Sequence, residues 1–337
     1  MKKAEAARKL LGAFSASSCP HHAREAATPP QVLSYSVNSS TDAEQPEYAF
    51  EMVGGRLRFG SGVTRELGLD LAAVGAKRTL VLTDRNLSSL APMRAVADSL
   101  TRHGREYEVF DAVRVEPTDA SFRQAIDFAR REVDDRPFDS FVALGGGSVI
   151  DTAKAAALFA ANPEADFFDY VVPPFGRGLE PQRPMRHLVA IPTTAGTGSE
   201  STNVAVLDLE SNNTKTVLRT RAIRPHLALV DPDHVRALPR EVAIYSGFDV
   251  LCHALESFTA LPYNQRKPRP STPSQRPVYQ GSNPISDVWA RSSLHIIRKY
   301  FRRAVADPED GEARANMLLG PVHTRKNTEN RERRSIG

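Results

Sequence analysis

Cysteine is nearly absent from this sequence of 337 residues, which contains only Cys19 and Cys252. Two cysteines exclude a disulfide-built scaffold and a cysteine-based zinc module, and they fit a reducing compartment. Long apolar runs are also missing, because no stretch approaches the ~18–20 residues that a membrane-spanning helix needs. We therefore expect a chain that neither spans a membrane nor depends on disulfides.

A basic body is missing as well, although the net charge of the whole chain is +4. Residues 1–30 and residues 321–337 each carry a net charge of +3, which leaves −2 for the residues between them. Nucleic-acid binding requires a basic patch on the folded body, so the charge distribution argues against a nucleic-acid partner. The remaining composition, 41% hydrophobic and 25% charged, is ordinary for a globular protein and excludes disorder throughout.

The N-terminal segment, residues 1–45, combines positive charges, Ser and Ala with few acidic residues. Leu10 and Phe14 lie close to these charges. This composition predicts an organelle transit peptide, with a plain disordered tail as the alternative.

The C-terminal segment changes character within a few residues. Glu312–Leu319 has Ala and Leu at helical spacing, and Gly320-Pro321 is expected to end that helix. Residues 320–337 are then mostly polar and charged without an apolar period, so we expect a disordered tail there.

Strand-like and helix-like patterns alternate through the middle of the chain. The predicted strands are Arg78–Thr83, Tyr107–Phe110, Phe138–Leu144, His187–Ile191 and Leu227–Val230. The predicted helices between them are Pro92–His103, Ser121–Val133 and Val149–Ala161. Such alternation predicts an α/β domain, a parallel sheet with helices on both faces.

Strand patterns stop near Leu238. Helical patterns cover Glu241–Thr259 and Ile285–Val305, with a proline-rich loop over residues 262–284. We therefore predict an α/β domain over residues 46–237, followed by an all-helical domain over residues 238–319.

The strongest local signal is the run GGGSVIDTAK, residues 145–154, which follows a predicted strand and opens a predicted helix. Glycines let a diphosphate approach the backbone closely, and a helix start offers free N–H groups and a positive dipole end. The run therefore predicts a phosphate site. A tight strand-to-helix turn that binds nothing is the alternative.

A second loop supports the phosphate site. Thr193, Thr194, Gly196 and Gly198 follow the strand at His187–Ile191, and their hydroxyl and backbone groups suit a phosphate, a ribose or a base edge. Both loops follow strands, and ligands of open α/β sheets bind beyond the carboxyl ends of the strands. Asp84 ends the first strand in the same layer. It is interpreted either as a ribose or base contact or as an acidic residue that caps a turn.

Two potential metal ligands occur in the first predicted helix of the second domain. Asp249 and His253 are four residues apart and share one helical face, so they could bind one divalent metal, iron or zinc. An i,i+4 ion pair is the alternative interpretation. Catalytic metal sites usually have three or more protein ligands. His295 and His323 follow downstream, but we expect the first on an amphipathic helix and the second in the tail.

These residues lie within a series of stretches that resembles the iron-containing alcohol dehydrogenase family. The resemblance covers about residues 46–319. The stretches that carry it are YAFEM from Tyr48, VRVEPTD from Val113, GGGSVIDTAK from Gly145, PTTAGTGSE from Pro192, SGFDVLCHALES from Ser246 and YQGSNPISD from Tyr279.

The resemblance implies a fold and a cofactor site. The fold is an NAD-binding α/β domain followed by an all-helical metal-binding domain, with the active site between them. The positions that match the family's NAD-binding residues are Gly146, Gly147, Ser148, Asp151, Thr193, Thr194 and Lys215. Asp249 and His253 match the first two of four metal ligands, one Asp and three His. The family's other two ligands lie on downstream segments that this sequence does not match.

The resemblance also implies a reaction and a location. A hydroxyacid such as 4-hydroxybutyrate is oxidised to succinic semialdehyde, while 2-oxoglutarate is reduced to 2-hydroxyglutarate through bound NAD and a divalent metal. The expected location is mitochondrial, the expected ligands are small hydroxyacids and oxoacids, and homo-oligomer formation is left open. Because family-like sequence stops near Leu319, we expect a shortened helical domain with weak or absent metal binding.

Three hypotheses about function follow. The chain is an active enzyme of this kind, a nucleotide-binding chain without activity, or an interaction module whose helices bind a partner. Bound metal would distinguish the first from the others. An exposed apolar face on Glu241–Thr259 would favour the third.

Overall fold

The computed structural model describes residues 45–325, apart from 53, 133–135, 237, 274–275 and 278–279. The predicted transit peptide, except its last residue, and the predicted tail from residue 326 onward lie outside the described residues. Contacts along the chain place residues Asp42–Gly337 in one unit, and the following description concerns that unit alone.

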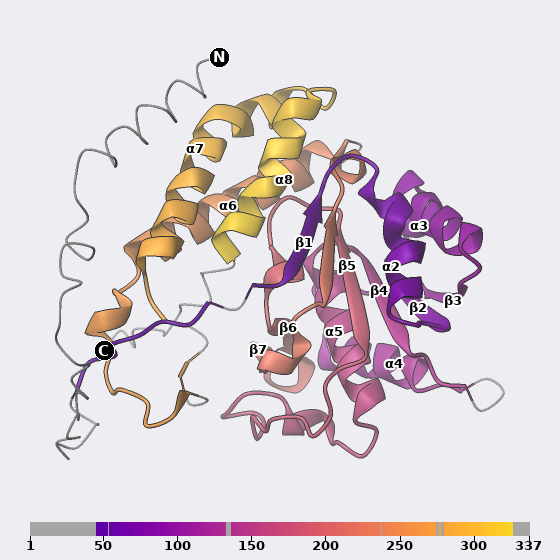
Figure 1. The fold of residues 1–337 in the computed structure, drawn as a ribbon, viewed down its shortest axis with the longest axis horizontal. Coiled ribbons are helices and arrows are strands. Elements are labelled where there is room, and N and C mark those ends of the chain that lie inside the picture. Colours follow the sequence, from indigo (N-terminus) through magenta and orange to yellow (C-terminus); the bar gives the residue numbers. More distant parts are fainter. Residues whose placement is uncertain are drawn as a thin grey trace, which may run out of the picture. The chain divides into compact units, whose positions relative to one another are not determined.

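In the described part of the chain, six parallel strands form a central sheet in the order β1-β8-β5-β4-β2-β3 (Figure 1). The five strands predicted from the sequence are all present, with ends shifted by one or two residues at most. The strands are β1 (Arg56–Phe59), β2 (Arg78–Leu82), β3 (Glu106–Phe110), β4 (Ser140–Gly145), β5 (His187–Pro192) and β8 (Leu227–Val230).

Helices cover both faces of this sheet, which confirms the predicted α/β class. Leu80 and Leu82 of β2 pack in one apolar cluster with α4 and α5, whereas Val81 packs in another with α2 and α3. This is the alternation expected of a strand that is buried on both sides. The four helices are α2 (Leu67–Ala73), α3 (Ala91–Arg102), α4 (Asp119–Ala129) and α5 (Gly147–Ala161).

Helix α4 begins earlier and ends earlier than the predicted span Ser121–Val133. Thr118 caps its start, because the Thr118 side chain accepts from the Ser121 amide at 3.2 Å and the Thr118 amide donates to Ser121 Oγ at 2.8 Å. At its end, Arg130 leaves the helix and its Nε donates to the Phe159 carbonyl at 3.3 Å. The capping hydrogen bonds and this contact with α5 set the two boundaries.

A two-stranded antiparallel hairpin was not predicted. Its strands, β6 (Val204–Leu209) and β7 (Thr214–Arg219), are joined through Asn213 with a φ of 45°. Strand β6 contacts α5, so α5 is covered both by the sheet and by the hairpin. This double cover explains why nearly every residue of α5 is buried.

Three further helices follow the last strand of the described sheet: α6 (Arg240–Thr259), α7 (Pro284–Ala306) and α8 (Gly311–Arg325) (Figure 1). They pack on one another and share an apolar cluster with Ala228 and Val230 of β8. Short 3-10 turns occur at Val63–Glu66, Leu87–Ser89, Phe167–Asp169, Ser199–Ser201, Glu210–Asn212, Arg221–Ile223, Pro232–Val235 and Tyr263–Gln265.

Helix α8 runs through Gly320 and Pro321, where the sequence predicted its end. A Cβ atom added at Gly320 would lie 3.1 Å from Val250 Cγ1 of α6, and the Gly320 carbonyl accepts from Ser293 Oγ of α7 at 3.0 Å. Packing against two helices outweighs the local preference of proline to end a helix. The predicted helix end is therefore wrong, and the residues up to Arg325 are helical rather than disordered.

Helix α6 presents a row of apolar side chains to solvent. Tyr245 is 72% exposed, Phe248 52% and Leu255 45%, and Val242 and Phe258 are exposed along the same helix. Across the described residues, no helix is long and apolar enough to cross a bilayer. The exposed fractions make the α6 row an apolar face on a helix that otherwise packs on α7 and α8.

Candidate functional site

The candidate site begins where β4 ends and α5 starts. Gly146 is the N-cap residue and offers no side chain to the first turn, and its carbonyl accepts from the amides of Val149 and Ile150 at 3.1 Å each. The Gly145 carbonyl accepts from the Thr193 amide at 3.1 Å, which ties the second loop to the first. A helix start at the carboxyl edge of a parallel sheet suits an anionic group, because its amides and dipole favour negative charge.

The glycines of this turn make room for the second loop. A Cβ atom at Gly147 would lie 2.7 Å from Thr197 Cγ2, and one at Gly146 would lie 3.2 Å from Thr194 Cγ2. A 2.7 Å contact of this kind forces a shift, because real Cβ atoms do not approach so closely. The nearest neighbours of these glycines are thus threonine side chains, and the two predicted phosphate loops pack directly on each other.

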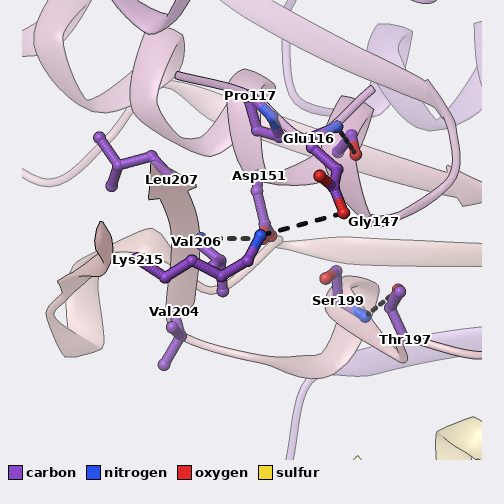
Figure 2. A pocket seen from close by; sticks show the side chains of 11 residues that line it. Glu116, Pro117, Gly147, Asp151, Thr197, Ser199, Val204, Val206, Leu207 and Lys215 are labelled. Atoms are coloured by element: carbon purple, nitrogen blue, oxygen red, sulfur yellow. Dashed lines mark hydrogen bonds and ion pairs between the residues drawn. The ribbon is translucent and has the colours of Figure 1, made fainter. Parts of the chain in front are cut away.

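A cavity of about 160 Å³ opens beside these loops (Figure 2). Four residues predicted for the cofactor site line it, namely Gly147, Ser148, Asp151 and Lys215. The prediction missed its other lining residues, which are Glu116, Pro117, Thr197, Ser199, Val204, Val206 and Leu207. Most of these lie on the hairpin and on the two loops, so only the packing of distant segments brings them together.

Lys215 reaches the cavity from β7. Its Nζ lies 3.3 Å from Asp208 Oδ1 and 4.0 Å from Glu116 Oε1, and its side chain is 60% exposed. A second cavity, of about 340 Å³, shares Lys215 and Glu116 with the first. An exposed ammonium group at the junction of two cavities can attract an anionic or hydroxyl-bearing ligand.

Glu116 closes the cavity from the loop before α4 (Figure 2). Its φ of 54° lies in the left-handed region, which is uncommon for a residue other than glycine. The Glu116 amide donates to Ser148 Oγ at 3.2 Å, so the side chain of the first α5 turn holds this conformation. A sequence signal for Glu116 was present in the stretch VRVEPTD, but its spacing alone indicated no contact with Ser148.

Asp151 lies on the cavity wall, and both of its carboxylate oxygens accept hydrogen bonds within the fold. Oδ1 accepts from Lys154 Nζ at 3.1 Å, and Oδ2 accepts from the Val206 amide at 3.0 Å. The side chain is almost fully buried. Its predicted contact with a cofactor stays a prediction, whereas its contacts with Lys154 and Val206 are direct.

Thr193 and Thr194 lie in the second loop, beside the first. Thr193 is buried, and Thr194 contacts the backbone position of Gly146. The two threonines are thus adjacent to the loop that lines the cavity. Their predicted role along a cofactor remains a prediction.

Asp84 caps a turn, which was the second of the two interpretations of this residue. Its Oδ1 accepts from the amides of Asn86 and Leu87, at 2.8 and 3.0 Å. The carboxylate therefore caps the turn that follows β2, and a contact with ribose or base remains a prediction for its other oxygen.

The two predicted metal ligands face each other on α6. His253 Nε2 lies 3.5 Å from Asp249 Oδ1, which is the i,i+4 geometry of an ion pair and also places two donors on one face. Among the described residues, no group of three or more His, Cys, Asp or Glu side chains could hold a metal. This part of the chain therefore supplies two donors, fewer than a catalytic metal site has.

Comparison with known proteins gives the class of this fold and site. Residues 54–232 match the model of the iron-containing alcohol dehydrogenase family. This match covers more than half of the sequence, so the chain belongs to the iron-containing alcohol dehydrogenase family.

Curated relatives identify individual proteins of this family that the chain resembles. The chain is 56% identical over 315 residues to the hydroxyacid-oxoacid transhydrogenase, mitochondrial, of Caenorhabditis briggsae, which covers 94% of this chain and 66% of the relative. It is 50% identical over 305 residues to the protein of the same name from Bos taurus, covering 90% of this chain and 63% of the relative. The chain thus spans a little under two thirds of the length of these relatives.

Solved structures share the fold. An alcohol dehydrogenase from Oenococcus oeni matches with a TM-score of 0.71 and 26% identity, covering 84% of this chain and 67% of that one. A sulfoacetaldehyde reductase from Bifidobacterium kashiwanohense, solved in complex with NAD+, matches with a TM-score of 0.67 and 25% identity, covering 82% of this chain and 66% of that one. Both agree with the parallel sheet and the helices that follow it.

Proposed function

We propose that this chain binds NAD in the cavity beside the start of α5 and acts as a hydroxyacid-oxoacid transhydrogenase. The observation that carries the proposal is the 50–56% identity to transhydrogenases over at least 90% of this chain. The cavity supports it, because Gly147 and Ser148 of α5 and Lys215 of β7 come from two separate segments and line one space.

The residues of the cavity would bind and orient the cofactor. The first amides of α5, at Gly147 and Ser148, suit a diphosphate, and Lys215 suits a ribose hydroxyl or a phosphate. Thr193 and Thr194 would lie along the same ligand from the second loop. Bound NAD would supply the hydride carrier between the two substrates.

In the proposed reaction, a hydride and a proton leave an alcohol substrate and an equal number are added to a ketone substrate. In the first half, 4-hydroxybutyrate loses a hydride and a proton and becomes succinic semialdehyde. In the second half, 2-oxoglutarate gains a hydride and a proton and becomes 2-hydroxyglutarate. The proposed ligands are therefore small hydroxyacids and oxoacids, and the proposed location is mitochondrial, as in the names of the relatives.

We propose only part of a site for a divalent metal, iron or zinc. Asp249 and His253 offer one oxygen and one nitrogen donor, which suits either metal. The described residues supply no third ligand, so they do not make a complete catalytic site. We therefore derive no step through a metal.

The incomplete metal site favours a second candidate function, NAD binding without hydride transfer. The cavity and its loops lie before residue 237, away from Asp249 and His253 in sequence. Diphosphate contacts from backbone amides need neither metal nor substrate. Cofactor binding can therefore persist where chemistry does not.

One pair of measurements tests both candidates. Calorimetric titration of the purified chain with NAD measures binding, and formation of 2-hydroxyglutarate from 4-hydroxybutyrate and 2-oxoglutarate measures turnover. Lys215→Met should weaken NAD binding about tenfold, whereas Lys77→Met, at an exposed position just before β2, serves as the matched control.

The outcomes separate the candidates. Binding with turnover supports the transhydrogenase, and binding without turnover supports the second candidate. If the wild-type chain binds no NAD, the site assignment is refuted. Equal NAD affinity in Lys215→Met and Lys77→Met would refute the role of Lys215.

A further inference from the structure

Lys154 is fully buried, with 0% of its surface exposed. A buried ammonium group is costly unless it is paired and hydrogen-bonded, because burial removes its hydration. Lys154 lies on α5, one turn beyond the residues that line the cavity. Its contacts therefore indicate what the fold gains by burying it.

The Lys154 ammonium group joins three segments. It donates to Asp151 Oδ1 on α5 at 3.1 Å, to Thr202 Oγ1 after the second loop at 2.8 Å, and to the Val204 carbonyl of β6 at 2.6 Å. The other oxygen of Asp151 accepts from the Val206 amide of β6 at 3.0 Å.

These three segments form most of the cavity wall, and the loop with Glu116 and Pro117 forms the rest. Helix α5 carries Gly147 and Ser148, the second loop carries Thr197 and Ser199, and the hairpin carries Lys215. Thr202 Oγ1 lies 3.3 Å from the Ser199 carbonyl, which extends the network into the second loop. Asp151 thus lies on the cavity wall with Lys154 behind it, and the pair is bonded to α5, to the residue after the second loop and to the hairpin.

We propose that Asp151 and Lys154 are positioning residues that hold the β6–β7 hairpin and the second loop against α5, and so set the width of the cofactor cavity. The role assigned to the cavity rests on the proposed NAD binding. Asp151 acts through Val206 and Lys154 in this proposal, rather than through direct contact with the cofactor.

The pair is tested by removing both charges together. Lys154→Met alone leaves a buried carboxylate without its cation, which destabilises the fold. The double variant Asp151→Leu with Lys154→Met replaces the pair with apolar groups of similar size and is expected to melt close to the wild type. It removes the bonds to Thr202, Val204 and Val206 without leaving a charge behind.

Two readouts are measured on the full chain. In the double variant, amide hydrogen exchange of residues 204–219 should rise about tenfold relative to β4, and NAD affinity should fall about tenfold at an unchanged melting temperature. Lys77→Met is the matched control, because it removes an exposed lysine outside the cavity. A purely stabilising pair would change the melting temperature and the NAD affinity together.

Each outcome decides the proposal. Faster exchange in the hairpin with weaker NAD binding supports it. Unchanged hairpin exchange, or faster exchange with unchanged affinity, overturns it. If the wild type binds no NAD, the proposed function fails, and hairpin exchange still decides whether the pair holds the hairpin. A double variant that does not fold overturns the proposal, because the pair then supports the fold as a whole rather than the position of the hairpin.

Discussion

At the scale of single residues, Gly147 matters because it has no side chain, which leaves room for Thr197. Thr197 occupies the space where a Cβ atom would lie, and Thr197 Oγ1 in turn accepts from the Ser199 amide at 3.3 Å. A substitution at Gly147 would therefore disturb the second loop before it met any ligand. The two loops are coupled by contact, and the helix start depends on both.

Gly147→Val should weaken NAD binding at least tenfold, because the branched side chain would push Thr197 and the second loop away from α5. Overpacking of this kind typically costs about 1–3 kcal/mol of stability. Calorimetric titration with NAD and a thermal melt check both effects.

Gly54→Val is the control for this change, because a Cβ atom at Gly54 meets nothing within 4 Å and no positive φ is involved. We expect its NAD affinity and melting temperature to match the wild type. Similar affinity in Gly147→Val and Gly54→Val would contradict the assignment of the loop.

His187 gives the fold a pH dependence. Burial, together with the neighbouring His226 ring at 4.6 Å, lowers the pKa of His187 to about 4 from 6.5. Its stabilising contribution is present above pH 6.5 and is lost as the pH falls toward 4, because the unfolded chain then binds more protons. With allowance for solvent around the half-buried ring, we expect a loss of about 1–2 kcal/mol.

His187→Gln should flatten the fall in stability between pH 6.5 and 4. Denaturant titrations of wild type and variant at several pH values measure the slope. Parallel slopes in the two proteins would show that His187 does not cause the loss.

At the scale of elements, α6 carries two features along its length. Asp249 and His253 form the i,i+4 pair, whereas Tyr245, Phe248 and Leu255 are exposed apolar side chains. The sequence predicted the pair and the helix but not which apolar residues would be exposed, because that depends on how α7 and α8 pack. This exposed apolar row favours the third hypothesis, that the chain is an interaction module whose helices bind a partner.

Asp249 and His253 should bind iron or zinc weakly. Elemental analysis of the purified, desalted chain is expected to show far less than one metal per protein, because two ligands hold a metal less firmly than three or four. Stoichiometric metal that disappears in His253→Ala would show that residues outside the described part complete the site.

The exposed row on α6 should drive association. Contiguous exposed apolar side chains of this size are typical of interaction surfaces or of aggregation. We expect the wild type to elute as oligomers or aggregates in size-exclusion chromatography with light scattering. The double variant Tyr245→Glu with Leu255→Glu should shift it toward the monomer.

Val115→Glu is a control for that variant, because Val115 is exposed to a similar degree, 68%, but lies in the loop before α4. It should leave the elution profile unchanged. A monodisperse wild-type monomer with a cooperative melt would contradict the prediction.

At the scale of the whole molecule, the sequence predicted the sheet better than the site. Strands β2, β4 and β8 are buried along their whole length and each contains an uninterrupted apolar run, so their pattern was sufficient. Strand β1 and the β6–β7 hairpin were missed. Strands β1 and β7 contain charged residues and lie partly exposed, so their sequences show no continuous apolar run.

The cavity, like the sheet, was predicted only in part from the sequence. Its glycine loop was recognisable because strand, glycines and helix follow one another in the sequence. Glu116 and Thr197 reach the cavity from separate loops, and only tertiary packing joins them to Ser148 and Gly147. Local patterns therefore identified one wall of the cavity, and the resemblance added Lys215 on another.

The place of β1 in the sheet has a consequence for the order of folding. Its register partner is β8, with Arg56 opposite Leu227, so within residues 45–325 the first strand pairs with the last strand. During synthesis β1 emerges long before β8 exists, and contacts of such high sequence separation form late. An elongating chain must therefore keep its first strand unpaired until residues 227–230 are synthesised. We expect proteases and chaperones to distinguish nascent chains that stop short of β8 from those that contain it.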